Sequence, residues 1–323
     1  FLGGLLPVVG AAIFALALGI LVRLVLGQAP APLARLSPGI GLASKPVLQI
    51  AVVLLSAKLS LGTIAQVGSQ SILVMLGSLG VAFLVAGLAG RALGVERRLA
   101  VLVGTGTAIC GDSAIAAAAP VIGAEDSDTA YAFSVIFAFN LAAVFLFPAL
   151  GHLFGLSDTG FGLWAGTAIN DTSSVVAASY AWSQAAGDYA VIVKLTRTLM
   201  IIPITLVLGW LAGRGHFDPA LASGQDSPAS AAPRPSRPAR ARLPWFIVAF
   251  LGASLLRTLG IIPEGLGKAL AEAGVLLIAV ALAGIGLSTD LGRIARTGWR
   301  PLVLGLLVWA AVATSSLLLG SLV

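Results

Sequence analysis

Long apolar runs, separated by short polar turns, recur along the whole chain. A run of about 20 apolar residues is long enough to cross the hydrocarbon core of a bilayer as a helix, and the pattern therefore predicts about ten membrane-spanning helices. Their approximate ranges are 5–26, 45–61, 71–89, 99–122, 129–150, 162–182, 189–211, 244–259, 274–287 and 301–319.

Composition supports this reading. Of the 323 residues, 58% are hydrophobic and only 10% are charged. A soluble fold of this size could not cover so much apolar surface with so few charges. The sequence therefore predicts an all-α polytopic membrane protein and argues against a soluble globular enzyme.

The net charge of +6 comes from arginines and lysines gathered in alternate connections between the apolar runs. The other connections are neutral or acidic, as at residues 125–128 and around Asp188. This alternation is the positive-inside pattern of a membrane protein. It places the basic turns in the cytoplasm and both Phe1 and Val323 outside, and it argues against a nucleic-acid partner. The basic residues are Arg35, Lys45, Arg91, Arg97, Arg98, Arg214, Arg234, Arg237, Arg240, Arg242, Arg293, Arg296 and Arg300.

One stretch, residues 213–243, has no apolar period and is rich in Pro, Ala, Ser and Arg. It is typical of a disordered cytoplasmic linker. It separates a first group of membrane segments, 1–212, from a second, 244–323, which together form one membrane domain. We interpret the linker as a solvated tether, and its arginines can also contact anionic lipid headgroups.

Cysteine and histidine usage argues against a resident metal or cofactor. Cys110 is the single cysteine, and His152 and His216 fall in separate turns. This excludes an internal disulfide and gives no ligand cluster for zinc or haem. The chain begins at Phe1 without a methionine, and we expect processing or a further helix upstream.

Two polar motifs interrupt the apolar runs, at residues 104–113 and 166–173, and both contain Gly-Thr and Ala-Ile. Each combines a carboxylate, Asp112 or Asp171, with hydroxyl groups and glycines. Ionisable groups at membrane depth normally face a cavity, a partner or an ion path, and glycines let the helix unwind there. The unwound backbone would expose amide groups suited to anions. The alternative is that small residues simply allow close helix contacts. The candidate binding residues are Thr107, Cys110, Gly111, Asp112, Ser113, Asn170, Asp171, Thr172 and Ser173.

Lys194 and Arg197 complete the candidate substrate- or ion-binding set. They are three residues apart on one predicted helix and therefore share a face. They could hold an anionic substrate or neutralise Asp112 and Asp171, and the alternative is a permanent structural salt bridge. Asn140, within the fifth predicted span, is more typical of a hydrogen bond between helices than of a ligand.

A weak internal repeat relates residues 59–68 to residues 287–298: both contain Leu-Ser, then Ile-Ala, then Gly. The charge pattern makes these two segments run in opposite directions, which predicts an inverted-repeat secondary-transporter fold with broken helices. The two polar motifs do not fit this symmetry, because their predicted spans run in parallel. Either one of them is partly re-entrant, or the two share only local chemistry.

Several longer motifs resemble the YeiH-type sulfate exporter family. They lie at residues 106–114, 120–122, 161–178, 193–197, 203, 244–246 and 286–289, so the resemblance covers essentially the whole chain. It implies an inner-membrane protein related in fold to bile-acid symporters and cation/proton antiporters, with crossed broken helices in a core domain beside a panel domain. It also implies anion export. The chain departs from that pattern at Asp112, where a small residue is usual, and at Asn170, where histidine is usual, and these departures bear on the substrate and on any histidine-based proton step.

Three functions stay open at this stage. The first is a secondary transporter of a small inorganic or organic anion, sulfate by resemblance, with symport of an organic acid with sodium or protons as its nearest variant. The second is an intramembrane aspartyl hydrolase that uses Asp112 and Asp171, but the chain lacks the Gly-x-Gly-Asp and Tyr-Asp signatures of such enzymes. The third is a membrane scaffold. We expect a non-enzymatic transporter without a cofactor, whose partners are a small anion, membrane lipids and, in a homodimer, a second copy of the chain.

Overall fold

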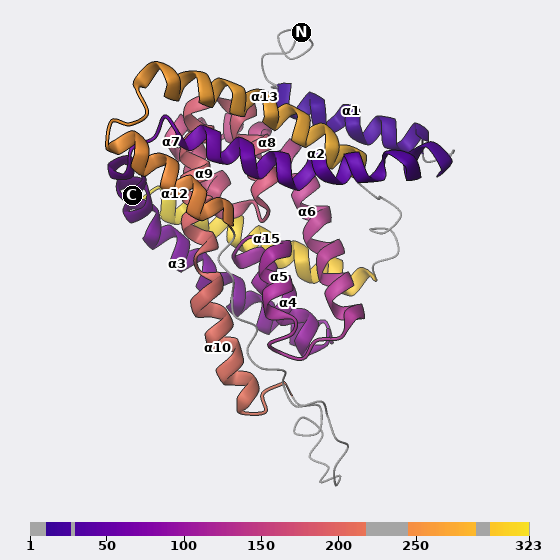
Figure 1. The fold of residues 1–323 in the computed structure, drawn as a ribbon. Helices are drawn as coiled ribbons and strands as arrows, with labels where there is room; N and C mark the ends of the chain where they lie inside the picture. The colour runs from indigo at the N-terminus through magenta and orange to yellow at the C-terminus, as the bar shows by residue number, and fades with distance from the viewer. Residues whose placement is uncertain (1–10, 27–29, 218–244, 289–297, 323) are drawn as a thin grey trace, which may run out of the picture.

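The computed structural model describes residues 11–26, 30–217, 245–288 and 298–322, and every regular element in these ranges is a helix (Figure 1). The sequence prediction of an all-helical protein is therefore confirmed. The helices are α1 (Ala11–Leu26), α2 (Pro30–Ser56), α3 (Leu61–Ala92), α4 (Arg97–Ala108), α5 (Asp112–Ala118), α6 (Asp126–Leu153), α7 (Asp158–Ala168), α8 (Thr172–Trp182), α9 (Gln184–Thr198), α10 (Ile201–Gly213), α12 (Trp245–Thr258), α13 (Glu264–Ser288) and α15 (Trp299–Gly320).

Six helical segments of the described chain are long and apolar enough to cross a membrane. Large apolar side chains such as Leu21, Leu84 and Leu276 point away from the protein, as expected where lipid is the solvent. Two further apolar helices are shorter. The six segments are Pro38–Ser56, Leu61–Ala92, Asp126–Leu153, Gln184–Gly213, Glu264–Ser288 and Trp299–Gly320, and the two shorter helices are Phe14–Val25 and Trp245–Thr258.

The predicted span 99–122 is instead a helical hairpin, made of α4 and α5, which we call hairpin 1. The side chain of Ile115 lies against Gly106, which is possible only if α5 folds back along α4. The turn between them contains Gly111, whose φ of +68° and ψ of −123° are strained for any residue with a Cβ atom. The backbone therefore reverses at a position where the sequence provides glycine.

Both ends of hairpin 1 lie beside the last turns of α10. Arg98, at the start of α4, donates a hydrogen bond to the Phe217 carbonyl at 3.0 Å. Val121, after α5, packs against Gly209 of α10. Because the two ends lie together, hairpin 1 enters the bundle and leaves it on the same side.

The predicted span 162–182 is also a hairpin, made of α7 and α8, which we call hairpin 2. Its two ends are held together by Trp182, whose indole N–H donates to the Asp158 carboxylate at 2.9 Å. The same indole stacks on Phe161, with 4.2 Å between the ring centroids. The prediction of one membrane-spanning helix at each of these two ranges is therefore wrong, because each apolar run folds into two half-length helices. The alternative that one of the two motifs is re-entrant came closer.

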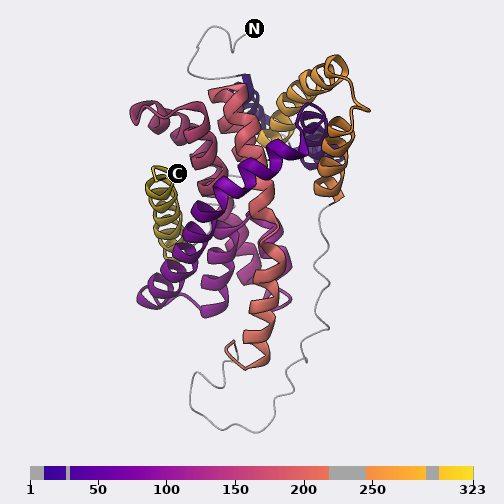
Figure 2. The same ribbon diagram turned by 90° about the vertical axis from the view of Figure 1, so that its left-hand side faces the viewer.

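The two hairpins approach each other from opposite ends of the bundle. Figure 1 shows α7 and α8 in its upper part and α4 and α5 in its lower part. Consecutive helices α9 and α10 run along the bundle between these levels, as the turned view shows (Figure 2). Gly166 of hairpin 2 packs against Val193 in α9, whereas hairpin 1 packs against the far end of α10. The two tips, residues 108–112 and 168–172, meet in the interior.

Because hairpin 1 returns to the side from which it enters, it also changes the side on which the following charged turn lies. Glu96, before α4, lies close enough to Arg98 and Asp128 for their charges to interact. The acidic turn at residues 125–128 is therefore on the same side as the basic turn that precedes α4. The expectation that these turns lie on opposite sides is wrong, since it assumed one crossing between them.

A second group of helices, α1, α2, α12 and α13, which we call the scaffold group, packs to one side of the hairpins. Figure 2 shows α12 and α13, in orange, beside the bundle. Glycines allow close packing in this group: Gly274 of α13 lies against the Ala51 carbonyl of α2, and Gly286 lies against α1 at Gly19. In the second half of the predicted repeat, residues 289–297 lie outside the described residues, as do Phe1, Val323 and the linker beyond residue 217.

Candidate functional site

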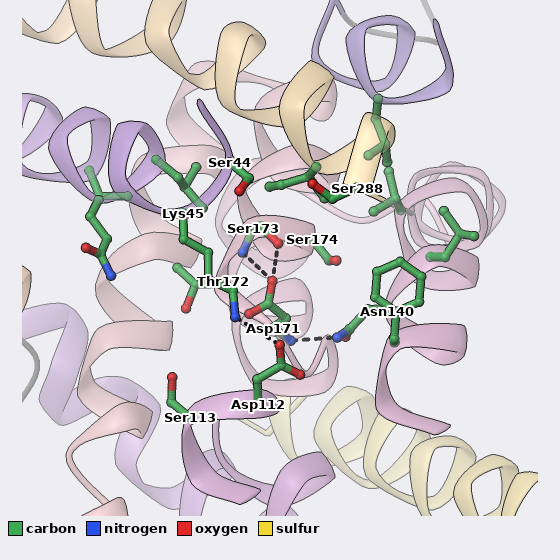
Figure 3. Close-up of a pocket in the computed structure, with 18 of the residues that line it drawn as sticks. Ser44, Lys45, Asp112, Ser113, Asn140, Asp171, Thr172, Ser173, Ser174 and Ser288 are labelled. Atoms are coloured by element: carbon green, nitrogen blue, oxygen red, sulfur yellow. Dashed lines mark hydrogen bonds and ion pairs between the residues drawn. The ribbon is translucent and has the colours of Figure 1, made fainter. Parts of the chain in front are cut away.

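A cavity of about 200 Å³ lies between the hairpin tips and the scaffold group (Figure 3). Its walls come from both tips, from the middle of α6 and from α1, α2, α12 and α13. A concave site in which polar groups converge among apolar side chains is typical of small-molecule binding. The polar lining residues are Ser44, Lys45, Gln49, Asp112, Ser113, Asn140, Asp171, Thr172, Ser173, Ser174 and Ser288.

Asp171 forms the N-cap of α8 at the tip of hairpin 2. Its carboxylate accepts a hydrogen bond from the backbone N–H of Ser173 at 3.0 Å and another from the Ser173 hydroxyl (Figure 3). A negative charge at a helix N-terminus is stabilised by the free amide groups and the helix dipole. The Asp171 N–H in turn donates to the Asn140 side-chain oxygen at 3.0 Å, which fastens the tip to α6.

Asp112 begins α5 at the tip of hairpin 1 and faces the same cavity. It forms an ion pair with Lys45 of α2, with 3.2 Å between Nζ and Oδ2. This pair is accessible from the cavity: 72% of the Lys45 side chain and 37% of the Asp112 side chain are exposed. Among the described residues, two carboxylates and one ammonium group therefore line the cavity, which leaves one carboxylate without a cationic partner in this lining.

The opposite face of the two tips is closed and holds Lys194. Its ammonium group donates to the carbonyl oxygens of Ile109 and Ile169, at 2.8 Å each. These carbonyls end α4 and α7, and the C-terminus of a helix carries a partial negative charge that favours a cation. One fully buried lysine thus joins the tip of hairpin 1 to the tip of hairpin 2.

Arg197 makes the equivalent connection one turn further along α9. Its guanidinium group donates to the carbonyls of Ala108 and Thr167, and it too is fully buried. Neither cation has a carboxylate partner among the ion pairs of the described residues. Both are held by backbone oxygens.

The predicted binding residues thus divide into two sets. Asp112, Ser113, Asp171, Thr172 and Ser173 are brought together around the cavity. The remaining six belong to the hairpin tips or to α9 but are not among the residues that line the cavity: Thr107, Cys110, Gly111, Asn170, Lys194 and Arg197. Within this second set, the side-chain polar atoms of Thr107 and Asn170 are buried and find no hydrogen-bond partner among the described residues.

Sequence reasoning missed Lys45 as a site residue, because it assigned Lys45 to a cytoplasmic turn. In the structure α2 begins at Pro30 and continues through Pro38 and Pro46, so that Lys45 lies well inside the helix. In the sequence, the one indication that Lys45 lies within a membrane helix is the apolar segment that follows it. Asn140 was expected to bond between helices, and it does bond to hairpin 2, but it also lines the cavity.

The fold and the site define a polytopic α-helical membrane protein with two opposed hairpins around a polar cavity. The sequence matches the family described as conserved hypothetical protein 698 over residues 1–305, and the chain belongs to this family. It is 38% identical over 320 residues to a UPF0324 membrane protein of Clostridium tetani, covering 98% of this chain and 91% of that relative. A UPF0324 membrane protein of Streptococcus pyogenes is 41% identical over 324 residues, with the same two coverages. No solved structure matches the chain.

Proposed function

We propose that this protein is a secondary transporter that moves a small anion across the bacterial inner membrane by alternating access. One observation carries the proposal: two hairpins that enter from opposite ends bring Asp112 and Asp171 to one cavity in the interior, where Lys45 of α2 faces them. Charged groups at this depth are costly and typically mark a substrate or ion path. Discontinuous helices that meet around a central site are the usual construction of secondary transporters.

The arrangement also supports an inverted repeat. Each hairpin is followed by a long helical segment, α6 after hairpin 1 and α9 with α10 after hairpin 2, and the two hairpins enter from opposite ends. The parallel direction that the sequence assigned to the two motifs followed from treating each as a crossing helix. We propose that the six long segments, α1, α12 and the two hairpins make ten membrane-embedded segments, of which the hairpins do not cross.

The charge of the cavity bears on what is carried. Lys45 and the serine hydroxyl groups can bind an anion, and sulfate is the candidate by resemblance. With two carboxylates against one ammonium, the cavity also favours a cation, and we propose a proton or a sodium ion as the coupling ion. A hydrolase is supported less well, because Asp171 is engaged in capping α8 and Asp112 in its ion pair with Lys45.

Flux in proteoliposomes tests the proposal. Radiolabelled sulfate, and in parallel runs a set of small organic acids, should accumulate in liposomes that contain the protein when a proton or sodium gradient is imposed. Empty liposomes, and liposomes with the gradient collapsed by an ionophore, serve as controls. Absence of gradient-driven flux for every anion, or flux that is the same with and without the imposed gradient, as through an open pore, would contradict the function.

A further inference from the structure

Lys45 is the one charged residue that the scaffold group contributes to the lining of the cavity. It comes from α2, which packs along α13, whereas its partner Asp112 belongs to hairpin 1. The two other ion pairs of the described residues, Lys58–Asp188 and Lys268–Glu264, do not line the cavity. The Lys45–Asp112 pair thus joins the two sides of the candidate site across the space that a ligand would occupy.

The surroundings of Asp112 leave it dependent on this partner. The charged groups that face it are Lys45 from α2 and Asp171 from hairpin 2, and Asp171 repels it. From α6 the cavity receives uncharged Asn140 and Phe137, and from α13 Ser288. The helix α10, which packs on α5, carries no charged residue, and Lys194 of α9 is bonded to carbonyls behind the tips. If Lys45 moves away, Asp112 has no other described cation to pair with in the cavity.

Among the described residues, Lys45 is also the only cationic group that lines the cavity and could bind an incoming anion. An anion and Asp112 therefore compete for the same ammonium group. When the anion wins, Asp112 loses its counter-ion and is left facing the like charge of Asp171, which is unfavourable. A proton on its oxygen, or a sodium ion beside it, removes this unpaired charge.

We propose that Lys45 is shared between Asp112 and the transported anion, so that the anion binds together with a proton or sodium ion that replaces Lys45 at Asp112. This inference rests on the proposed function and supplies its coupling step. It makes Lys45 a residue that binds the anion and Asp112 the residue that binds the cation. Two ligands that each favour the state in which the ion pair is broken must raise each other's affinity by the same factor.

Equilibrium binding of radiolabelled sulfate to the purified protein in detergent tests the coupling. For the wild type, we expect sulfate affinity to rise about tenfold, a typical coupling, either when sodium replaces choline at constant pH or when the pH falls at constant sodium. The first result identifies sodium as the cation and the second a proton. Asp112→Asn removes the competing charge, so sulfate should still bind, with an affinity that no longer depends on the cation. Lys45→Gln should lose sulfate binding.

Glu264→Gln is the matched control, because it removes a carboxylate from an exposed lysine pair on α13, away from the cavity. It should keep the cation dependence of the wild type. Sulfate affinity that is independent of both cations in the wild type, or that keeps its cation dependence in Asp112→Asn, would overturn the coupling and leave the transport function standing. Absence of sulfate binding to the wild type under every condition, together with absence of sulfate flux, would overturn the proposed substrate and the coupling with it.

Discussion

The two faces of the hairpin tips carry opposite chemistry. Towards α9, the tips present the carbonyl ends of α4 and α7, and the fully buried Lys194 and Arg197 donate hydrogen bonds to them. Towards α2, the tips present two carboxylates and the N-terminus of α8, and this face is open to a cavity. The same chain reversals thus create a sealed cationic contact on one side and an accessible acidic one on the other.

The difference lies in what holds each cation. Lys194 bonds to two backbone oxygens that belong to different hairpins, so it cannot leave without loosening both tips. Lys45 bonds to one carboxylate and is largely exposed, so it can change partner at low cost. The contacts of a basic residue in an apolar helix therefore decide whether it has a structural role or is free to bind a ligand. Its position within the apolar run does not.

The largest effect should come from removing the sealed contact. Lys194→Met leaves two helix-terminal carbonyls buried without a donor and two half-helices without a counter-charge. We expect a loss of about 3–5 kcal/mol in stability, as for other broken buried charge contacts. Thermal unfolding in detergent measures it, with Lys268→Met in the exposed pair on α13 as control.

Arg197→Gln should behave in the same way as Lys194→Met. The opposite result would be an unchanged unfolding temperature combined with lost sulfate binding. It would assign both cations to the substrate, as the sequence alone suggested.

The second-largest effect should be on transport, and it concerns the face of the tips that is open to the cavity. Asp112→Ala and Asp171→Ala should each abolish anion flux in proteoliposomes while the protein stays membrane-inserted, since removing a charge lowers the cost of insertion. They should differ in stability, because Asp171 also caps α8. Loss of such a cap costs about 0.5–2 kcal/mol, and Asp171→Asn, which can still cap, should recover most of it. Flux at the wild-type rate in both alanine variants would remove the carboxylates from the site.

These two faces show where sequence reasoning succeeds and where it stops. The apolar runs and the two polar motifs were sufficient to predict an all-helical membrane protein and to place Asp112 and Asp171 at interruptions of helices. They could not distinguish a crossing helix from a hairpin, because both need about 20 apolar residues with a break in the middle. That distinction depends on contacts such as Ile115 with Gly106 and Trp182 with Asp158, which join residues far apart in sequence.

The roles of the basic residues could not be predicted from the sequence either. The spacing of Lys194 and Arg197 correctly put them on one face of a helix, but nothing in the sequence says that this face meets the backbone carbonyls of two other segments. Lys45 was assigned to a connection because of its charge, whereas α2 begins at Pro30 and continues through Pro38 and Pro46, so that Lys45 lies inside the helix.

A smaller effect should distinguish the two tips from each other. Gly111 turns hairpin 1 with a positive φ, whereas at the tip of hairpin 2 Ile169 and Asp171 have negative φ values. Gly111→Ala should destabilise the protein by about 1–3 kcal/mol, the usual cost of forcing a side chain into such a conformation. Gly80→Ala in the middle of α3, where an added methyl group meets no atom within 4 Å, is the control and should be neutral or stabilising. Equal unfolding temperatures for the two variants would show that the tip of hairpin 1 does not require this backbone geometry.

The smallest effect on stability should come from the cation of the open face. Lys45→Met removes an ion pair that is largely exposed to the cavity, and such pairs contribute about 0–1 kcal/mol. The unfolding temperature should therefore stay close to that of the wild type, in contrast to Lys194→Met, although the two variants lose the same charge. Both proteins can be measured in one detergent by thermal unfolding, with sulfate binding recorded on the same samples. Lys45→Met should keep its fold and lose sulfate binding, whereas Lys194→Met should lose stability first. If Lys45→Met is as unstable as Lys194→Met, the pair with Asp112 is a permanent structural contact, and the open face cannot work by exchanging partners.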